Sequence, residues 1–338
     1  MKRRAVIEDG IGETRAAVYE GRRLVEFHLR RHVGPHMARA KDIYTGRVSA
    51  VDPSVAGAFV DLGIGPAGLL KFSSRKALPK LTEGMLIDVE ISRAAIGTKG
   101  PNLKFTNEAS RDAVGPVKCN NLREYLTLKY PEIIFEETSV SALDDAVERN
   151  IAIKGGGSVW FDQTQALLAI DVDKGSESSP LDNSLAAATL IASQLRLRGL
   201  GGLIVIDFPN LRQAKHRTSL LRHLEKVFET DAAIVKIAPM SRFGCIELTR
   251  SIDDISLDAL VNDRFGRPTL DTLALRAIRR LEREGSVNAG AKLTLHAPEH
   301  VFNWLETTEL DWRGELTSRI GARFDVKLGQ TIDVSVDR

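Results

Sequence analysis

The chain divides into segments whose apolar residues recur at every second position and segments whose apolar residues recur every three or four positions. The first pattern predicts strands with one buried face, and the second predicts amphipathic helices. Alternation governs residues 4–30, where Glu20 and Gly21 predict the tight turn of a hairpin or meander. Short strands with glycines at their bends follow over residues 41–106, and this succession predicts a small closed barrel.

Two short runs, 167–170 and 203–206, are almost wholly apolar. Runs of this kind are typical of strands that are covered on both faces. An amphipathic helix, with Asn183 or Ser184 as its expected N-cap, lies between them and ends at Gly199. Strand, helix and strand in this order predict two parallel strands of one sheet, joined by a right-handed crossover.

Each apolar run is followed at once by an aspartate, Asp171 after the first and Asp207 after the second. The two carboxylates are then expected at the same edge of the sheet, where open α/β sheets keep their binding sites. An unpaired carboxylate is costly to bury, so a partner such as a cation is expected there. We predict that Asp171 and Asp207, with Asp173 as a third candidate ligand, share a divalent metal ion.

The remaining periodicity predicts further elements and no internal repeat. Residues 107–122 are polar and are expected to form a linker. Helices are expected at 122–130, 140–150, 213–229, 269–284, 300–306 and 312–320, and strands at 234–237, 242–248, 292–295, 324–328 and 331–336.

The composition is that of an ordinary globular protein, with 338 residues, 43% hydrophobic, 27% charged and a formal charge of +2. No run approaches the roughly 18 apolar residues of a membrane span, and the first residues lack the apolar core of a signal peptide. Cys119 and Cys245 are too few for a disulfide framework or a cysteine-built zinc site, and Cys245 is expected to be a small core residue. We therefore expect a cytoplasmic protein of two or three domains.

Basic residues are concentrated at the N-terminus, where residues 1–50 carry many arginines and lysines against few acids. Such a segment favours a partner that bears phosphate. A solvated surface explains the same pattern equally well, so both interpretations stay open.

The cues within the barrel segment resemble those of an S1-type oligonucleotide-binding barrel. They are Tyr-x-Gly-Arg-Val at 44–48, Ala-Phe-Val-Asp-Leu-Gly at 58–63 and Gly-Leu-Leu at 68–70. Barrels of this type bind single strands by stacking bases on exposed aromatic rings beside basic side chains. For each aromatic residue, a position in the barrel core is the alternative. The candidates for RNA contact are Tyr44, Arg47, Phe59 and Lys99.

Three ordered pieces lie between residues 162 and 250, after the barrel and an N-terminal hairpin that contains Thr14-Arg15-x-Ala17. The pieces are Asp162-x-Thr164-x-Ala166-Leu167-x-Ala169-Ile170-Asp171-Val172, Gln194-Leu195-Arg196-Leu197-Arg198-x-Leu200-Gly201-Gly202-Leu203-Ile204-Val205-Ile206-Asp207-Phe208, and Ser241-Arg242-Phe243-Gly244-x-x-Glu247-x-x-Arg250. Together they closely resemble the catalytic half of the ribonuclease E/G family.

The resemblance implies an α+β multidomain protein with an S1-type OB barrel, a deoxyribonuclease-I-like α/β catalytic domain and a small C-terminal α+β domain. The corresponding segments are 1–37 for the N-terminal β-hairpin, 38–106 for the barrel, 107–150 for a linker with helices, 151–262 for the catalytic domain and 263–338 for the C-terminal domain.

The resemblance also implies a Mg²⁺-dependent endoribonuclease that cleaves single-stranded, often A/U-rich RNA to 5′-phosphate and 3′-hydroxyl ends. Asp171 and Asp207 match the metal-binding aspartates, and Arg242 in the third piece is a further candidate RNA contact. One or two carboxylates suit Mg²⁺, with Mn²⁺ as an alternative ion. The ion would polarise a phosphoryl oxygen, help to form the attacking hydroxide and stabilise the charge of an in-line displacement.

Several residues depart from the family pattern. Asp173 stands where the family usually has Asn, Gln165 where it has Glu, and Asn210 where it has a second Asp. Leu69 replaces the second phenylalanine of the S1 barrel. The changes at residues 165, 173 and 210 alter the charge around the aspartates and bear on turnover and metal preference. The change at residue 69 bears on base stacking.

Two larger features of the family are missing. The segment between the barrel and the helix near residue 125 is too short for the 5′-sensor pocket and most of the ribonuclease-H-like subdomain, and Ile234 replaces an arginine that helps to read the 5′-monophosphate. Residues 252–268 replace the Cys-Pro-x-Cys zinc link, so no zinc is expected. We predict cleavage that is independent of a 5′-monophosphate, and a monomer or a dimer built without zinc.

Two other functions remain open. The changes at residues 165, 173 and 210, with the loss of the sensor, favour an RNA-binding protein that is catalytically weak or inactive. A factor associated with ribosomes or their assembly would use the barrel but would leave the paired aspartates unexplained. Metal-dependent cutting that is lost on substitution of either aspartate separates the enzyme from the two binding functions.

Overall fold

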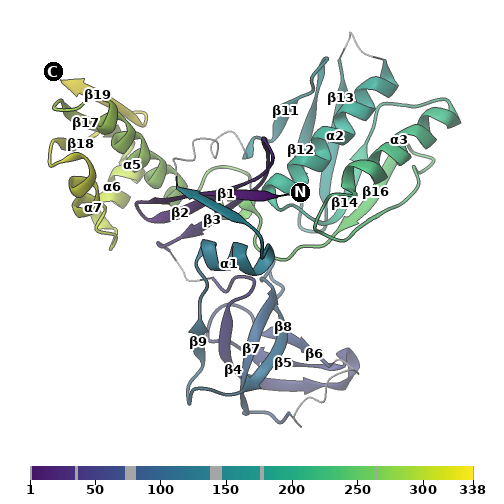
Figure 1. Ribbon diagram of the computed structural model, residues 1–338, viewed down its shortest axis with the longest axis horizontal. Coiled ribbons are helices and arrows are strands. Elements are labelled where there is room, and N and C mark those ends of the chain that lie inside the picture. Colours follow the sequence, from purple (N-terminus) through teal and green to yellow (C-terminus); the bar gives the residue numbers. More distant parts are fainter. Residues whose placement is uncertain are drawn as a thin grey trace.

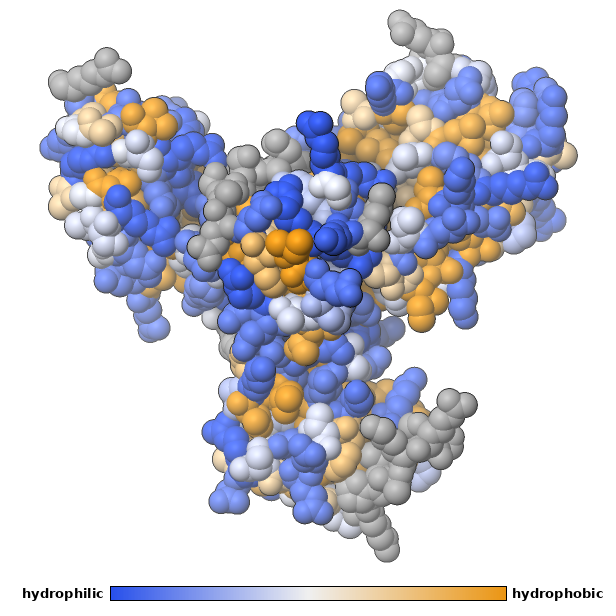
Figure 2. Space-filling model, in the orientation of Figure 1, coloured by the Kyte–Doolittle hydropathy of each residue, from blue (hydrophilic) through white to orange (hydrophobic). Residues whose placement is uncertain are grey.

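The computed structural model describes residues 2–34, 37–72, 81–137, 147–175, 179–263 and 265–337. Its architecture is α+β, with several sheets and helices, as the sequence predicted. Three lobes extend from a small sheet at the centre of the molecule, and they remain distinct in the space-filling view (Figures 1 and 2). Within the described residues, no helix has the length and apolar character needed to cross a membrane.

The central sheet is built from the N-terminal segment and has the order β10-β1-β2-β3. Its strands carry apolar residues on both faces, so a second element covers each face. Helix α1 packs on one face, and helix α4 packs on the other. The elements are β1 (Arg3–Gly10), β2 (Glu13–Glu20), β3 (Arg23–Arg31), β10 (Ile134–Glu137), α1 (Leu122–Lys129) and α4 (Leu257–Val261).

The predicted turn after Glu20 is confirmed, because Gly21 follows β2 with a φ of 61° and β3 begins at Arg23. Among its described residues, the segment 107–150 holds β9 (Gly115–Lys118) and β10 in addition to α1, and the sequence had not indicated these strands. β9 extends the barrel sheet, and β10 pairs in parallel with β1. The helix expected at 140–150 falls largely on residues 138–146, which lie outside the described residues.

A closed barrel forms the lobe at the bottom of Figure 1. Closure follows from the pairing of β4, which bonds to β5 on one side and to β7 on the other, while β6 and β8 complete the circuit. Apolar side chains fill its interior. The elements are β4 (Ile43–Asp52), η1 (Pro53–Val55), β5 (Gly57–Asp61), β6 (Gly68–Lys71), β7 (Leu86–Arg93), β8 (Asn102–Glu108) and β9 (Gly115–Lys118).

The lobe that carries the two aspartates is a mixed sheet with the order β11-β12-β13-β14-β16-β15. β13 and β14 are parallel neighbours on either side of α2 in the chain, so the predicted strand–helix–strand unit is confirmed. The elements are β11 (Asn150–Ala152), β12 (Gly157–Gln163), β13 (Leu168–Lys174), α2 (Pro180–Arg198), β14 (Gly202–Asp207), α3 (Ala214–Phe228), β15 (Val235–Ile237) and β16 (Cys245–Arg250).

The expectation that the two apolar strands are covered on both faces is wrong. Helices α2 and α3 contribute to a core with Ile170, Ile204 and Ile206, which lie on one face of the sheet. The opposite face is open, and Leu203 on that face is 43% exposed. Leu203 and Val205 are apolar but do not lie in the core. An almost wholly apolar sequence therefore forms a strand that has one exposed face.

Helix α2 begins earlier than the sequence suggested. Its N-cap is Ser179, whose hydroxyl accepts a hydrogen bond from the backbone N–H of Asp182 at 3.1 Å, and Pro180 occupies the first helical position. Proline suits this position because its missing N–H would have no partner there. Asn183 instead donates its side-chain amide to the carbonyl of Gly156 at 3.0 Å and so anchors the helix to the β11–β12 turn.

The C-terminal lobe is a three-stranded sheet, ordered β18-β17-β19, with three helices packed against it. It contacts the central sheet at Gly12, where an added Cβ would lie 2.7 Å from a methyl group of Leu275. The elements are α5 (Leu270–Val287), β17 (Lys292–Ala297), α6 (Glu299–Thr307), α7 (Trp312–Ile320), β18 (Phe324–Leu328) and β19 (Asp333–Asp337).

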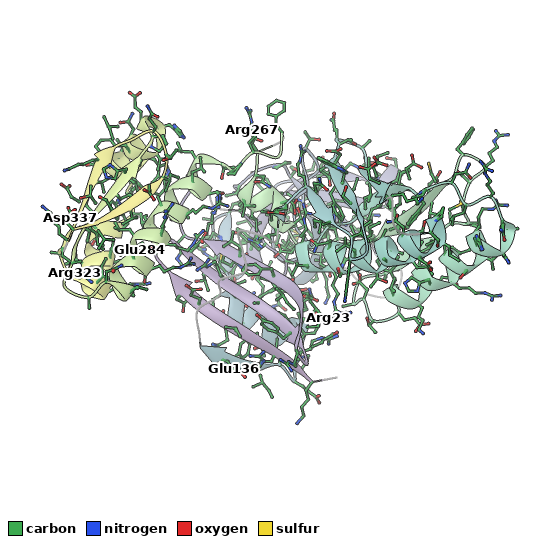
Figure 3. All side chains as sticks on the ribbon, turned by 90° about the horizontal axis from the view of Figure 1, so that it is seen from above. Arg23, Glu136, Arg267, Glu284, Arg323 and Asp337 are labelled. Carbon is green, nitrogen blue, oxygen red and sulfur yellow. The ribbon has the colours of Figure 1, made fainter. Side chains whose placement is uncertain are left out.

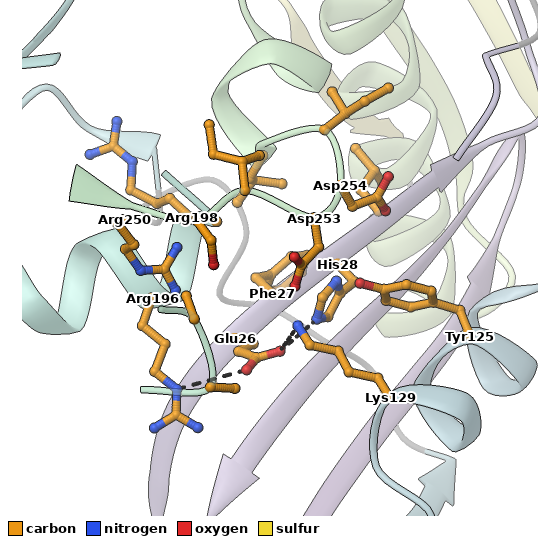
Figure 4. A pocket seen from close by; sticks show the side chains of 18 of the residues that line it. Glu26, Phe27, His28, Tyr125, Lys129, Arg196, Arg198, Arg250, Asp253 and Asp254 are labelled. Carbon is orange, nitrogen blue, oxygen red and sulfur yellow. Dashed lines mark hydrogen bonds and ion pairs between the residues drawn. The ribbon is translucent and has the colours of Figure 1, made fainter. Parts of the chain in front are cut away.

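A buried ionic cluster around Glu26 joins the central sheet to the neighbouring lobe. Glu26 is 4% exposed, and Lys129 Nζ donates to it at 2.9 Å. His28 Nε2 lies 3.0 Å from the same carboxylate, and Arg196 Nε of α2 lies 3.7 Å from it (Figure 4). The adjoining cavity has a volume of 60 Å³, which holds a few water molecules and is too small for a nucleotide.

The basic character of residues 1–50 has a structural use. Within the described residues, many of these cations form ion pairs with acids from the central sheet, the barrel or the C-terminal half of the chain. This pairing favours a role in stabilising the central sheet and its junctions over the phosphate-binding interpretation. The pairs are Arg3–Glu20, Arg4–Glu136, Arg15–Glu8, Arg30–Asp42, Arg39–Asp254 and Lys41–Glu90.

Candidate functional site

Asp171 on β13 and Asp207 on β14 occupy directly paired positions in the parallel ladder. Neighbouring strands lie about 4.8 Å apart, and paired residues project from the same face of a sheet. Both aspartates are exposed, while Ile170 and Ile206 just before them are buried. The fold thus brings the two predicted metal ligands side by side on the open face.

The electrostatic setting of this pair suits a cation. Burial, followed by the negative charges of Asp173 and Asp207, raises the pKa of Asp171 above its usual value. Within the described residues, no lysine or arginine forms an ion pair with Asp171 or Asp207. Two adjacent carboxylates without a basic partner repel each other, and a bound divalent cation relieves that repulsion.

Asp173 lies two residues beyond Asp171 on the same face, and a different partner holds its side chain. The indole Nε1 of Trp160 on β12 donates a hydrogen bond to Asp173 Oδ2 at 3.2 Å. In the part of the chain that the structure describes, no group of three His, Cys, Asp or Glu side chains is placed to hold a metal. The structure therefore assembles the pair of aspartates, but not the pair together with Asp173.

The other side of Asp207 is bordered by β16. Cys245 is the register partner of Asp207, and its Sγ lies 3.9 Å from Asp207 Oδ1. The expectation that Cys245 is a core residue is wrong, because it is half-buried and lies on the open face. Burial, and then the charge of Asp207, raises the pKa of the thiol above its usual value, so the free thiol stays protonated at neutral pH.

The strand expected at 242–248 begins only at Cys245, because residues 241–244 form a turn. Arg242 lies on this turn, and its guanidinium stacks on the ring of Phe243 at 5.2 Å from the ring centre. Phe243 is 79% exposed. The predicted RNA contact Arg242 is therefore exposed and adjoins the strand that borders Asp207.

The four candidates on the barrel fall into two groups. Tyr44 is fully buried in the barrel core, where its ring cannot stack on a base, so its predicted role in RNA contact is wrong. Phe59 is half-buried on β5, and Arg47 and Lys99 are exposed. Arg47 donates a hydrogen bond to the carbonyl of Gly84 at 3.1 Å, which holds it on the barrel surface.

Two aromatic residues beside the aspartates were not singled out from the sequence. Trp160 is the register partner of Asp171 and is 41% exposed, and Phe243 belongs to the turn before Cys245. The alternation in β12 carried the signal for Trp160, because Val159 and Phe161 on either side of it are buried. Two strand neighbours that point inward place the residue between them on the open face.

Residues 105–252 match the model of the ribonuclease E/G family. Ribonuclease G of Escherichia coli (strain K12) is 26% identical over 259 residues, which cover 71% of this chain and 51% of that protein. Ribonuclease E of the same strain is 38% identical over 117 residues, which cover 32% of this chain and 11% of that protein. Ribonuclease E of Haemophilus influenzae is 37% identical over 117 residues.

Over residues 105–252 the chain is similar to the ribonuclease E/G family, and the relatives it matches are ribonucleases E and G. The matched segment contains both aspartates, Trp160 and the turn with Arg242. The chain spans 51% of the length of ribonuclease G and 11–13% of the length of the ribonuclease E proteins that it matches. The resemblance found in the three sequence pieces is therefore confirmed at the level of the family.

Proposed function

We propose that this protein is a metal-dependent endoribonuclease that cleaves single-stranded RNA. The observation that carries the proposal is the direct pairing of Asp171 with Asp207 on an open sheet face. Mg²⁺ prefers a site of one or two carboxylates completed by water and substrate phosphate, and this donor set fits it, with Mn²⁺ as the alternative ion. When bound, the ion supplies charge neutralisation and an activated water for hydrolysis to 5′-phosphate and 3′-hydroxyl ends.

The other residues of the site would position the RNA. Arg242 is exposed at the end of the sheet that carries the aspartates, and its charge attracts the phosphodiester backbone. The closed barrel, which we assign to the S1 type, offers Phe59 as a stacking surface and Arg47 and Lys99 as cations. Stacking needs unpaired bases, so the substrate is single-stranded, with A/U-rich sequences as the preferred class.

The test uses a labelled A/U-rich oligonucleotide and three proteins: wild type, Asp171→Asn and Asp207→Asn. We expect the wild type to cleave with Mg²⁺ and not to cleave with a chelator. Each variant should lose at least about 100-fold in cleavage rate. A Lewis-acid metal contributes several kcal/mol to lowering the barrier, and 1.36 kcal/mol corresponds to a tenfold change in rate. Binding of the oligonucleotide without any cleavage, unchanged in both variants, would contradict the proposal.

An RNA-binding protein with weak or absent catalysis is the second candidate. The contact between Trp160 and Asp173 favours it, because that carboxylate is engaged within the protein. The same experiment separates the candidates, since the second predicts binding without metal-dependent cutting.

We further propose that cleavage does not depend on a 5′-monophosphate. Ile234, at the position of the family arginine that reads this group, is 71% exposed and carries no charge. Between the barrel and the catalytic lobe, the described residues hold only short strands and α1. Two oligonucleotides of the same sequence, one with a 5′-monophosphate and one with a 5′-hydroxyl, should be cut at equal rates, and a clear preference for the first would refute this point.

A further inference from the structure

Trp160 stands beside the aspartate pair on the open face of the sheet. It is the register partner of Asp171, and Asp171 is in turn the register partner of Asp207. The three side chains therefore form one row across neighbouring strands, with strand spacings of about 4.8 Å. A nucleotide whose phosphate reached the aspartates would have its base within reach of the indole.

The indole is both exposed and fixed in orientation. It is 41% exposed, although an apolar surface of this size is usually buried. Its Nε1 donates to Asp173 Oδ2, which restrains rotation of the ring about its side-chain bonds. A preoriented aromatic surface loses little entropy when a base stacks on it, so the arrangement favours a binding role.

The edge of the sheet beyond Trp160 carries a cation, Arg149, with an acidic partner. Asp162 lies two positions along β12, on the same face, and Arg149 Nη2 is 3.8 Å from its carboxylate. An added Cβ on Gly266 would clash with the guanidinium of Arg149, so the loop that carries Gly266 is in contact with Arg149.

That loop carries a second exposed aromatic residue with a cation on it. Phe265 is 56% exposed, and the guanidinium of Arg267 stacks on its ring at 5.1 Å from the ring centre. Figure 3 shows Arg267 on a loop that projects from the body of the molecule. The loop lies in the segment 252–268, where the sequence has no zinc-link cysteines.

We propose that Trp160 is a base-stacking residue that positions the RNA strand beside the scissile phosphate, and that the strand continues over Arg149 toward the loop of Phe265 and Arg267. This inference rests on the proposed function for its substrate class. It adds a specificity-determining residue, which selects an unpaired base next to the cleaved bond. A base in a duplex is stacked on its neighbours and is not available to the indole.

The test measures binding separately from cleavage. All proteins carry Asp171→Asn and Asp207→Asn, which prevents cutting, and a labelled single-stranded A/U-rich oligonucleotide reports affinity by fluorescence anisotropy. Trp160→Ala should weaken binding by about 5- to 160-fold, the range expected for the loss of one stacked base. Trp160→Phe keeps a stacking ring but loses the hydrogen bond to Asp173, so it should bind within about threefold of the parent.

Two controls address a merely structural effect of the substitution. Leu203→Ala removes an apolar side chain that is 43% exposed on the same face, away from the row of Trp160, and it should leave affinity unchanged. Oligonucleotide binding should also quench tryptophan fluorescence in the parent, and this quenching should be lost in Trp160→Phe while affinity is kept. A purely structural tryptophan would not produce that combination.

The outcomes distinguish this inference from the proposed function. Binding that depends on Trp160, in a protein whose wild type does not cut, supports the stacking role and refutes the nuclease. Metal-dependent cutting by the wild type, together with Trp160→Ala binding within twofold of the parent and no quenching, overturns the stacking role and leaves the nuclease standing.

Discussion

The side chain of Trp160 holds Asp173 by a hydrogen bond of 3.2 Å from its indole Nε1. Asp171, on the same strand as Asp173, has Asp207 as its neighbour on the next strand. The three aspartates that the sequence predicted to share one metal ion therefore have different surroundings in the fold. Two stand as an adjacent pair, and the third is engaged by an aromatic side chain.

We expect Asp173→Asn to retain most of its cleavage activity. An amide at this position can still accept the hydrogen bond from Trp160, and the aspartate pair remains intact. The rate at saturating Mg²⁺ should stay within about tenfold of the wild type, whereas Asp171→Asn should lose at least about 100-fold, a difference of about 1.4 kcal/mol or more. Equal losses in the two variants would make Asp173 a metal ligand.

Phe59 and Tyr44 on the barrel should respond differently to substitution. Phe59→Ala removes a half-buried surface ring and should weaken single-stranded RNA binding by about 1–3 kcal/mol with little effect on the thermal midpoint. Tyr44→Ala empties a fully buried position and should lower stability by about 3–5 kcal/mol. Fluorescence anisotropy measures RNA binding, and thermal unfolding measures stability, in both variants. If Phe59→Ala binds RNA more weakly only to the extent that the protein is unfolded, the surface role of Phe59 is contradicted.

The ion pair between Arg39 and Asp254 should be a major contributor to stability. Arg39 donates two hydrogen bonds to this carboxylate, at 2.8 and 2.9 Å. Burial raises the pKa of Asp254, but the charge and hydrogen bonds of Arg39 outweigh it and hold the pKa at about 2. Asp254→Asn leaves Arg39 buried without its counter-charge and should cost about 3–5 kcal/mol in urea unfolding.

The matched control for that substitution is Asp333→Asn. Asp333 pairs with Arg280, but both side chains are about half exposed, at 57% and 48%. Exposed pairs contribute about 1 kcal/mol or less, so this variant should unfold close to the wild type. If Asp254→Asn and Asp333→Asn lowered the free energy of unfolding by similar amounts, burial would not determine how much these ion pairs contribute to stability.

The stability of the protein should fall as the pH drops below the range in which free histidine titrates. Burial is the main cause that lowers the pKa of His28, with Lys129 adding to it, although Glu26 and Asp254 oppose the shift. The pKa of this histidine is lower in the folded state than in the unfolded state, where it is about 6.5. Its contribution to stability is therefore fully present above about pH 6.5 and is lost as the pH falls through the pKa of the folded state.

The urea midpoint of the wild type should therefore decrease between pH 7.5 and pH 5.5, and it should decrease less in His28→Gln. Glutamine keeps a group that can hydrogen-bond to Glu26 but takes up no proton. An identical pH dependence in the two proteins would assign the titration to another group.

The sequence by itself determined the local elements and the pairing of the aspartates. Apolar periodicity, Gly21 and Gly199 marked strands, a turn and a helix end, because these depend on neighbouring residues. The order of strand, helix and strand then required parallel strands, which placed Asp171 beside Asp207. The three family pieces supplied the chemistry expected of that pair.

Only the tertiary structure decided which faces are covered and which distant side chains meet. Periodicity shows which residues share a face, but not whether another element packs on it, so Leu203 and Tyr44 could be assigned to core or surface only in the folded chain. The contact of Arg39 with Asp254 joins residues that lie far apart in the sequence. Side-chain partners of this kind depend on how the lobes pack, and local patterns carry no information about that packing.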